Sequence, residues 1–347
     1  MALTINTNIS SIIAQRNLNK ATNTLNDSIE RMSTGYKINH ASDNAAGYSI
    51  SNMWVTQLGS LDVASDNAST GADMLTTAEE TYSLLTSHLQ RVRDLTEQAA
   101  NGTYGSQSLR AIQSEIAARL MEVDRISANA EFNGIKLMKY SSEAGADNSD
   151  VGMTANGIDL QVGLYAKSES QIHLDVDLFK DASCFGLFNK FKDAPTTAEG
   201  KKLSELMTQA GGTLANLGSA DADEKNKAIQ AFAAMCSGLK YNAADSSFVL
   251  QTETWAVPKE TLQYIDAAIN EISDRVVKIG SAQNRVLSAI DALDVQSQNL
   301  TSSLSTLRDT DIATESSSFI QAQILQQASA TLLSTANQTP SIALNLL

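Results

Sequence analysis

The histidines have the widest chemical range of any side chains in this sequence, because imidazole binds metal ions and transfers protons near neutral pH. A metal or catalytic site needs several His, Cys or carboxylate groups at short, defined spacings. His40, His88 and His173 lie far apart in the chain, and no HExxH pattern occurs. We therefore predict solvated or locally hydrogen-bonded histidines, no metal site and no cofactor.

Other reactive patterns are missing as well. The sequence has no phosphate-binding glycine loop, dinucleotide-binding fingerprint or nucleophile elbow. A formal net charge of −14 and a pI of about 4.6 argue against nucleic acid, because phosphate binding needs clustered Lys and Arg. Cys184 and Cys236 are the only cysteines, and buried thiols are favoured over a disulfide that staples one small domain. These patterns favour a protein that is not an enzyme.

Two charged pairs on a long predicted helix have ordinary explanations. Glu79 and Glu80 are expected to form a solvated acidic pair. Arg91 and Arg93 flank a heptad seam, where local ion pairs contribute roughly 0.3 kcal/mol each. Residue type and spacing alone assign them no further role.

Long helices are the elements that would position these side chains. From Leu262 to Leu307, fourteen positions recur in alternating steps of three and four, and twelve of them are apolar. This heptad seam is typical of a coiled coil. As one helix of 46 residues it would be roughly 70 Å long, so we predict a rod. Pro258 precedes the predicted helix, and the seam breaks at residues 309–311.

The last 32 residues, 316–347, contain neither charged residues nor histidine. Apolar side chains at spacings of three, four and seven, opposite Gln, Ser, Thr and Asn, predict an amphipathic helix. The segment is too polar to cross a bilayer, so no membrane insertion is expected. Uncharged faces can pack against copies of themselves without burying charge.

The N-terminal half mirrors this layout, and its first helix has few charges. The predicted helices span about 5–32, 45–100 and 106–129. For the first and last helices to cover each other, the two ends of the chain must meet. Their remaining apolar faces predict lateral self-association.

The middle of the chain differs. Asn133-Gly134 predicts a hairpin, and alternating residues predict strands near 158–162 and 172–176. Residues 178–253 predict a compact insert. Its expected features are helices near 198–210 and 223–239, a strand near 248–250, and a cluster of Phe179, Phe185, Phe188 and Phe191. The fold class is therefore mainly α: a long coiled-coil-like rod formed by both chain ends, a small β-hairpin region and a compact α+β central insert.

Both ends resemble bacterial flagellin, over about residues 1–138 and 254–347. The matching motifs, in order, are Ser28-Ile-Glu-Arg-Met-Ser-Thr-Gly35, Leu89-Gln-Arg-Val-Arg-Asp-Leu95, Glu131-Phe-Asn-Gly-Ile-Lys136, Gln283-Asn-Arg285, Asp309-Thr-Asp-Ile-Ala-Thr-Glu315, Ala322-Gln-Ile-Leu-Gln-Gln327 and Ala336-Asn-Gln338. The insert matches nothing that we can name.

The resemblance implies a structural subunit that self-assembles into a helical homopolymer, the flagellar filament outside the cell, for motility. It implies type III export without a signal peptide, with an export chaperone, cap and hook-junction proteins as partners. The implied domains are an N-terminal inner-tube helix (1–36), rod helices plus the β-hairpin region (37–177), a variable surface-exposed insert (178–253), a C-terminal rod helix (254–310) and a C-terminal inner-tube helix (311–347). The residues expected to carry polymerisation are Ile5, Ile9, Ile12, Leu18, Leu25, Ile29, Ile320, Ile324, Leu325, Leu332 and Leu333.

The family also carries a site that is read by the Toll-like receptor that senses flagellin. The residues that match this site are Arg91, Leu95, Gln98, Glu115 and Arg119. Asp94 stands where Glu is usual, and Thr96-Glu97 replaces small apolar residues, which adds negative charge beside the patch. The resemblance thus implies that this chain is a ligand of the receptor.

Three other functions remain open at this point. A hook-filament junction protein would share related ends but fewer of these motifs. An enzyme with its active site in the insert, as in flagellins that bear a protease domain, is disfavoured because the insert lacks HExxH. A soluble coiled-coil binding module would stay monomeric.

Overall fold

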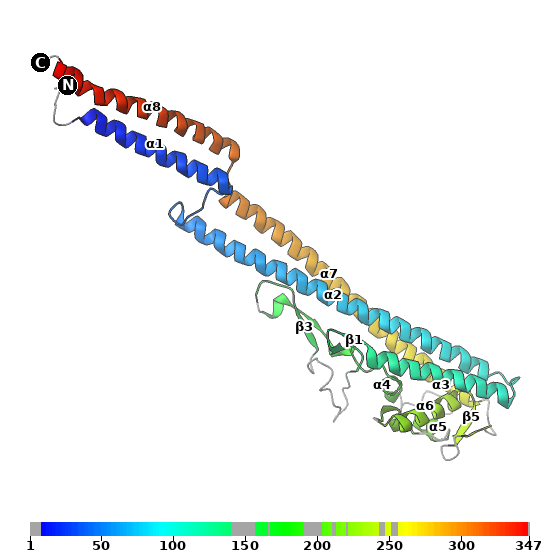
Figure 1. Cartoon of the computed structure of the whole chain (residues 1–347). Helices are drawn as coiled ribbons and strands as arrows, with labels where there is room; N and C mark the ends of the chain where they lie inside the picture. Colours follow the sequence, from blue (N-terminus) through cyan, green and yellow to red (C-terminus); the bar gives the residue numbers. More distant parts are fainter. Residues whose placement is uncertain are drawn as a thin grey trace. The chain divides into compact units, whose positions relative to one another are not determined.

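The computed structural model arranges the chain in two compact units (Figure 1). The first unit contains residues 1–62 and 294–347, and the second contains residues 63–293. The described residues are 8–139, 157–165, 167–190, 203–209, 213–219, 221–242, 247–250 and 256–345. Ile5 and Phe191, named above for polymerisation and for the phenylalanine cluster, lie outside them. No helix among the described residues is both long enough and apolar enough to cross a membrane.

Long helices form where the sequence predicts them, and the mainly α fold class is confirmed. They are α1 (Ile9–Thr34), α2 (Ala45–Ala99), α3 (Ser106–Asn129), α7 (Ala256–Arg308) and α8 (Ile312–Asn345). The predicted break separates α7 from α8. Pro258 lies inside the first turn of α7 rather than before it, a position where the helix needs no backbone N–H.

Local chemistry sets the helix boundaries. Gly35 ends α1 because it adopts the left-handed conformation, with φ 76°, and its N–H donates to Arg31 O at 2.8 Å. Asn44 starts α2, since its Oδ1 accepts a hydrogen bond from Gly47 N at 2.9 Å. These side-chain and glycine caps satisfy backbone groups that have no partner inside the helix.

In the first unit, α1 and α8 lie side by side and antiparallel (Figure 1). Asn8 Nδ2 donates to Ala336 O at 2.7 Å, although the two residues are 328 positions apart. At the other end of the pair, Arg31 Nη1 lies 3.9 Å from Glu315 Oε2. The two ends of the chain therefore meet, as predicted.

In the second unit, α3 and the adjoining parts of α2 and α7 share one hydrophobic core. The fourteen seam positions of α7 are all buried or half-buried, so the heptad pattern correctly identified the inward face. Gln283 is the polar seam residue in this unit, and its Nε2 donates to Glu79 Oε2 at 2.8 Å. The expectation of a solvated acidic pair is therefore wrong for Glu79, because the half-buried amide needs an acceptor. Glu80 is exposed.

Two antiparallel hairpins follow α3, as predicted. They are β1 (Glu131–Phe132) with β2 (Ile135–Lys136), and β3 (Ile158–Gln161) with β4 (Gln171–Leu174). Asn133 and Gly134 have φ of 49° and 81°, the left-handed turn that an Asn-Gly pair favours. Leu160 of β3 packs against Gly71 of α2, where the absent side chain allows the strand to approach the helix.

The middle of the chain contains short elements. They are η1 (Ser168–Ser170), η2 (Val176–Leu178), α4 (Cys184–Asn189), α5 (Leu203–Gln209), η3 (Leu214–Gly218), α6 (Ala222–Cys236), β5 (Leu239–Asn242) and β6 (Ser247–Leu250). The prediction extended the second insert helix to residue 239 and missed α4 and β5. In the structure α6 ends at Cys236, and β5 pairs with β6. A helix of six residues and a strand that follows a helical pattern directly give little periodic signal.

Part of the insert belongs to the core of the second unit. Residues 231–239 are all buried, and α6 packs against α3. The phenylalanine cluster is partly present, since Phe188 and Phe232 have ring centroids 4.5 Å apart and Phe179 is fully buried. The insert therefore shares its hydrophobic core with the long helices.

Both cysteines are free and buried, the state that the sequence favoured. Burial raises the pKa of the Cys236 thiol to about 12 and raises the pKa of Cys184 well above its usual value. Because the thiolate is the reactive form, both thiols are inert while the core is closed.

Two helical glycines test the packing of β3 on α2. Alanine in place of a helical glycine stabilises by about 1 kcal/mol when the added methyl group has space. At Gly280 of α7 a Cβ would meet nothing within 4 Å, whereas at Gly71 it would collide with the Leu160 side chain. We expect Gly280→Ala to raise the midpoint of urea unfolding and Gly71→Ala to lower it. Equal stabilisation by both substitutions would contradict the contact between β3 and α2.

Candidate assembly surface

The contact between α1 and α8 is made by small side chains at heptad spacing. On α1, Ala14, Ala21 and Ser28 are seven residues apart and buried. On α8, Ala322 and Ser329 repeat the same spacing and are buried as well. Short side chains let two helices approach closely. This small-residue seam therefore joins the two helices without burying their large apolar side chains.

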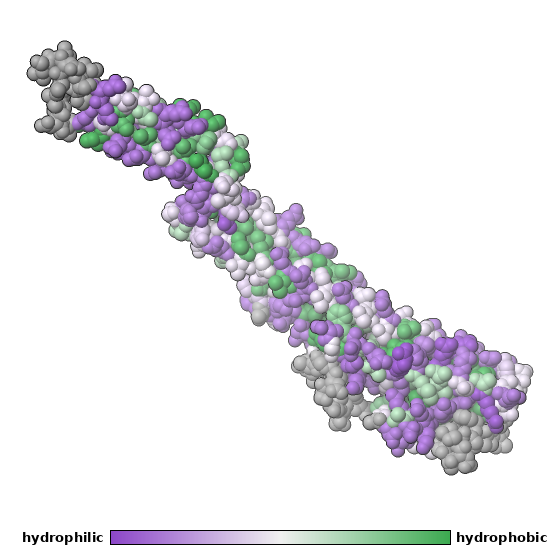
Figure 2. Space-filling view, in the orientation of Figure 1, coloured by the Kyte–Doolittle hydropathy of each residue, from purple (hydrophilic) through white to green (hydrophobic). Residues whose placement is uncertain are grey.

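Most of the residues predicted to carry polymerisation point away from this seam. Leu18, Leu25 and Leu333 are half-buried beside it. The others are 49–63% exposed: Ile9, Ile12, Ile29, Ile320, Ile324, Leu325 and Leu332. Figure 2 shows apolar residues, in green, at the surface along both helices.

An exposed apolar surface of this kind marks an interaction site. Full burial of one Leu or Ile side chain stabilises by roughly 1.5–3 kcal/mol, so several of them give a strong drive for association. Glu315 is the one charged residue in α8. Leu325 and Leu332 also line a groove between the two helices, together with Lys20 and Ala21 of α1. The α8 side of the surface can thus be covered with little charge buried.

A backbone clasp joins the end of α1 to the start of α8. Thr310 N donates to Gly35 O at 2.9 Å, and Lys37 N donates to Arg308 O at 2.6 Å. The guanidinium carbon of Arg308 lies 4.0 Å from the centroid of the Tyr36 ring, a cation–π contact. The clasp fixes the point at which α8 begins relative to the end of α1.

Asp311 caps α8 immediately after the clasp. Thr314 Oγ1 donates to Asp311 Oδ2 at 2.8 Å, and the Ala313 N–H donates to Oδ1 at 3.0 Å. These hydrogen bonds, that of the Thr314 hydroxyl first, hold the pKa of the Asp311 carboxyl below its usual value. An ionised Asp also suits the positive end of the helix dipole.

In the second unit, three of the predicted receptor-binding residues form a cluster between α2 and α3. Glu115 Oε1 accepts hydrogen bonds from Arg91 Nε and Nη2, both at 2.9 Å, and lies 3.8 Å from Arg119 Nη2. Their side chains are 37–47% exposed. Gln98 Nε2 donates to the Tyr104 hydroxyl at 2.9 Å. Leu95 is only 2% exposed, so it supports the cluster from the core.

Arg93, two residues from Arg91, faces a different helix. Its Nε lies 2.6 Å from Asp266 Oδ1 of α7, and its Nη1 lies 3.2 Å from Glu97 Oε2. The predicted local ion pair is present only between Arg93 and Glu97, because the other partners of the two arginines lie on α3 and α7. Only Arg91 belongs to the cluster with Glu115.

Two of the histidines lie beside a carboxylate. His40 Nε2 lies 2.8 Å from Glu30 Oε1, and His173 Nδ1 lies 2.7 Å from Asp159 Oδ1 on the paired strand. Across the residues that the structure describes, no group of three or more His, Cys, Asp or Glu is arranged to hold a metal ion.

The small-residue seam was missed from the sequence, although its signal was present. The pattern search followed large apolar residues, which in α1 and α8 mark the outward faces. The buried positions carry alanine and serine, which are common in helices for other reasons. Their repeat of seven residues was the feature that could have identified them.

Comparison with known proteins finds matches to both ends of the chain. A model of the bacterial flagellin N-terminal helical region matches residues 5–143, and one of the C-terminal helical region matches residues 262–347. Flagellin C of Vibrio cholerae is 35% identical over 387 residues, and polar flagellin F of Vibrio parahaemolyticus is 32% identical over 379 residues. Each alignment covers 100% of both chains. The chain belongs to the bacterial flagellin family.

The resemblance of the two ends is thus confirmed, and flagellin membership supports a structural subunit of the flagellar filament. Such a role needs surfaces for self-packing rather than a reaction centre. A solved structure of FliC from Burkholderia pseudomallei aligns with 62% of this chain at 19% identity and a TM-score of 0.35, which adds nothing to the family assignment.

The Asp311 cap gives α8 a defined pH dependence. Because folding lowers the pKa of the Asp311 carboxyl, the ionised cap stabilises α8 at pH values above the unfolded pKa of 3.8. This stabilisation is lost as the pH falls through the pKa of the folded state. We expect amide-exchange protection at Ala313 and Thr314 to decrease as the pH falls below 3.8. Asp311→Asn keeps an acceptor that does not titrate, so in this variant the protection of the same two amides should not change with pH. A natural chain with the same pH-independent profile as Asp311→Asn would disprove this role for the carboxylate.

Proposed function

We propose that this chain is a filament subunit that polymerises through the exposed apolar faces of α1 and α8, which pack against the same helices of neighbouring copies. The observation that carries the proposal is that side-chain sizes are distributed in the opposite way to a normal helix pair. Small residues lie between the two helices, and large apolar residues lie outside. A helix pair that was complete as a monomer would bury its large side chains instead.

Copies of the same chain are the partner that best fits this surface. The exposed face of α8 has no charge beyond Glu315, so a partner would gain little from charge complementarity there. A second α8 face is equally uncharged, and burying the two together leaves no unpaired charge in the contact. Association would stabilise both helices, because folding and binding are linked.

The other partners follow from the family. We infer export of the chain through the flagellar type III apparatus and a location in the extracellular filament. An export chaperone, the filament cap and the hook-junction proteins would be the accessory partners. Family membership supports these assignments, and the apolar surface of α1 and α8 gives a physical reason for a chaperone before assembly.

We also infer recognition by the Toll-like receptor that senses flagellin, through the cluster of Arg91, Glu115 and Arg119. The cluster is exposed and presents paired charges of both signs. The described part of the insert packs elsewhere, since α6 lies on the face of α3 where Gln230 contacts Gln113. Leu95 would act by holding the α2 turn that carries Arg91, since its side chain is buried.

Leu325 tests the polymerisation surface. We expect Leu325→Asp to abolish filament growth after seeding, because a carboxylate in a packed apolar layer costs several kcal/mol per contact. Sedimentation and electron microscopy would measure growth, and circular dichroism would confirm that the second unit stays folded. Leu325→Met keeps an apolar side chain of similar volume and should polymerise normally. Normal filaments from Leu325→Asp would contradict the assignment of this face.

Arg91 and Glu115 test the receptor site, with Arg93 as a matched control. In a cell reporter assay, Arg91→Ala and Glu115→Ala should reduce the response at least tenfold, because each removes one partner of the exposed ion pair. Arg93→Ala removes an arginine two residues away that faces α7, and it should change the response little. Equal responses from the natural chain and all three variants would sink the receptor proposal.

A further inference from the structure

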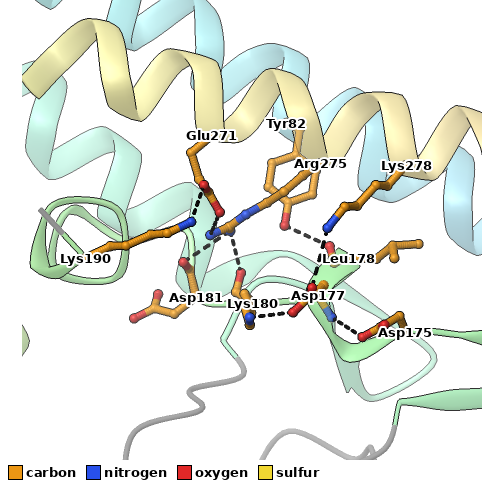
Figure 3. A network of polar contacts seen from close by, with 10 residues as sticks. All are labelled: Tyr82, Asp175, Asp177, Leu178, Lys180, Asp181, Lys190, Glu271, Arg275 and Lys278. Carbon is orange, nitrogen blue, oxygen red and sulfur yellow. Dashed lines mark hydrogen bonds and ion pairs between the residues drawn. The ribbon is translucent and has the colours of Figure 1, made fainter. Parts of the chain in front are cut away.

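The connecting segment, residues 175–190, leads from β4 through α4 and begins the insert. It lies against α2 and α7, whose side chains reach its backbone (Figure 3). The carbonyls of Leu178, Lys180 and Asp181 accept hydrogen bonds from these side chains. A buried carbonyl that loses its donor is costly, so the position of the segment depends on the donors.

Arg275 of α7 is the main donor. It is 5% exposed, and its Nη1 donates to Lys180 O at 3.0 Å and to Asp181 O at 3.3 Å. Its Nη2 lies 3.5 Å from Glu271 Oε1, one helical turn away, which keeps the buried charge paired. A planar guanidinium can serve both carbonyls and the carboxylate at once, which a lysine ammonium does less well.

Tyr82 of α2 completes the contact. It is fully buried, and its hydroxyl donates to Leu178 O at 2.9 Å. The guanidinium carbon of Arg275 lies 5.9 Å from the centroid of the Tyr82 ring. Two helices thus hold adjacent points of the same irregular backbone.

Ion pairs surround this contact at the surface. Lys190 Nζ lies 2.6 Å from Glu271 Oε2, and Lys278 Nζ lies 3.4 Å from Asp177 Oδ2. Asp177 also pairs with Lys180. Exposed pairs of this kind contribute little to stability, so Arg275 and Tyr82 carry most of the restraint that comes from polar contacts.

Beyond the connecting segment, the insert covers one face of α3. Cys184 N donates to Asp124 Oδ1 at 2.7 Å, and Lys225 Nζ lies 3.0 Å from Asp124 Oδ2. Asp124 is 7% exposed and Gln113, farther along α3, is 2% exposed. These polar groups would be solvated if the insert moved away, which lowers the cost of opening relative to an all-apolar contact.

We propose that Arg275 and Tyr82 form a latch that keeps α4 and α6 of the insert closed over α3, and that these two helices open as a local unit when the latch is broken. Opening exposes the α3 face that contains Gln113, Leu120 and Asp124. The long helices also contact each other away from the insert, where Gln283 of α7 donates to Glu79 of α2, so this part of the core stays closed. Proteins commonly open in such sub-global units.

The two native cysteines report on this opening without any added probe. Cys184 follows the latched carbonyls by three residues, and Cys236 lies at the end of α6, in the part of the insert next to α3. Both are at most 1% exposed, so alkylation by a maleimide in the full-length chain requires opening. Amide exchange in α2 between residues 72 and 92 reports separately on the helical core.

Arg275→Met should increase the alkylation rates of both Cys184 and Cys236 about tenfold, because two carbonyls lose their donor. Tyr82→Phe keeps the ring and removes one donor, so we expect an increase of about threefold. Arg275→Lys keeps the charge, so its alkylation rates should lie between those of the natural chain and those of Arg275→Met. If Arg275→Met does not fold, Arg275→Lys and Tyr82→Phe provide the same test.

Each other outcome would overturn part of the proposal. Unchanged alkylation of both thiols in the variants would show that Arg275 and Tyr82 form no latch. Acceleration at Cys184 alone would show that the insert does not open as a unit. A matching acceleration of amide exchange in α2 would show global destabilisation in place of local opening.

Discussion

Close packing of α1 against α8 through alanine and serine is the constraint on which the first unit depends. Because the seam positions hold side chains too short to fill a wide interface, the helices approach each other closely and their isoleucines and leucines remain outside. The pair therefore joins both ends of the chain and still presents an unsatisfied apolar surface. Under the proposed polymerisation, association would cover this surface and stabilise the helix pair.

The sequence predicted the long helices well because their signals are local and repeated. The seam from Leu262 to Leu307 extends over many turns, and Gly35, Asn44 and the 309–311 break each act through their own backbone chemistry. The insert was predicted less well because α4 is short and β5 follows α6 directly. The assembly surface was only partly predictable. Most of the residues predicted to carry polymerisation are exposed, but which side chains face inward depends on the distance between helices, which a hydrophobic pattern does not contain.

Buried polar groups were even harder to predict, because their partners lie on distant segments of the chain. Glu79 looked solvated from its position, yet Gln283 on another helix needs its carboxylate. Arg275 sits in a helix whose seam is apolar, and no local pattern indicates that two backbone carbonyls of a distant segment lie within its reach. Such contacts select one arrangement of the chain rather than adding much stability, a role for which buried polar groups are suited.

The clasp between residues 35–37 and 308–310 is built from main-chain atoms, and this has a consequence for sequence drift. Since the donors are the N–H groups of Lys37 and Thr310, side chains at these positions are free to vary without weakening the pairing. Proline alone is excluded at both, because it lacks the N–H. Related chains can thus diverge in amino-acid identity at this turn while inheriting the same connection between their first and last helices.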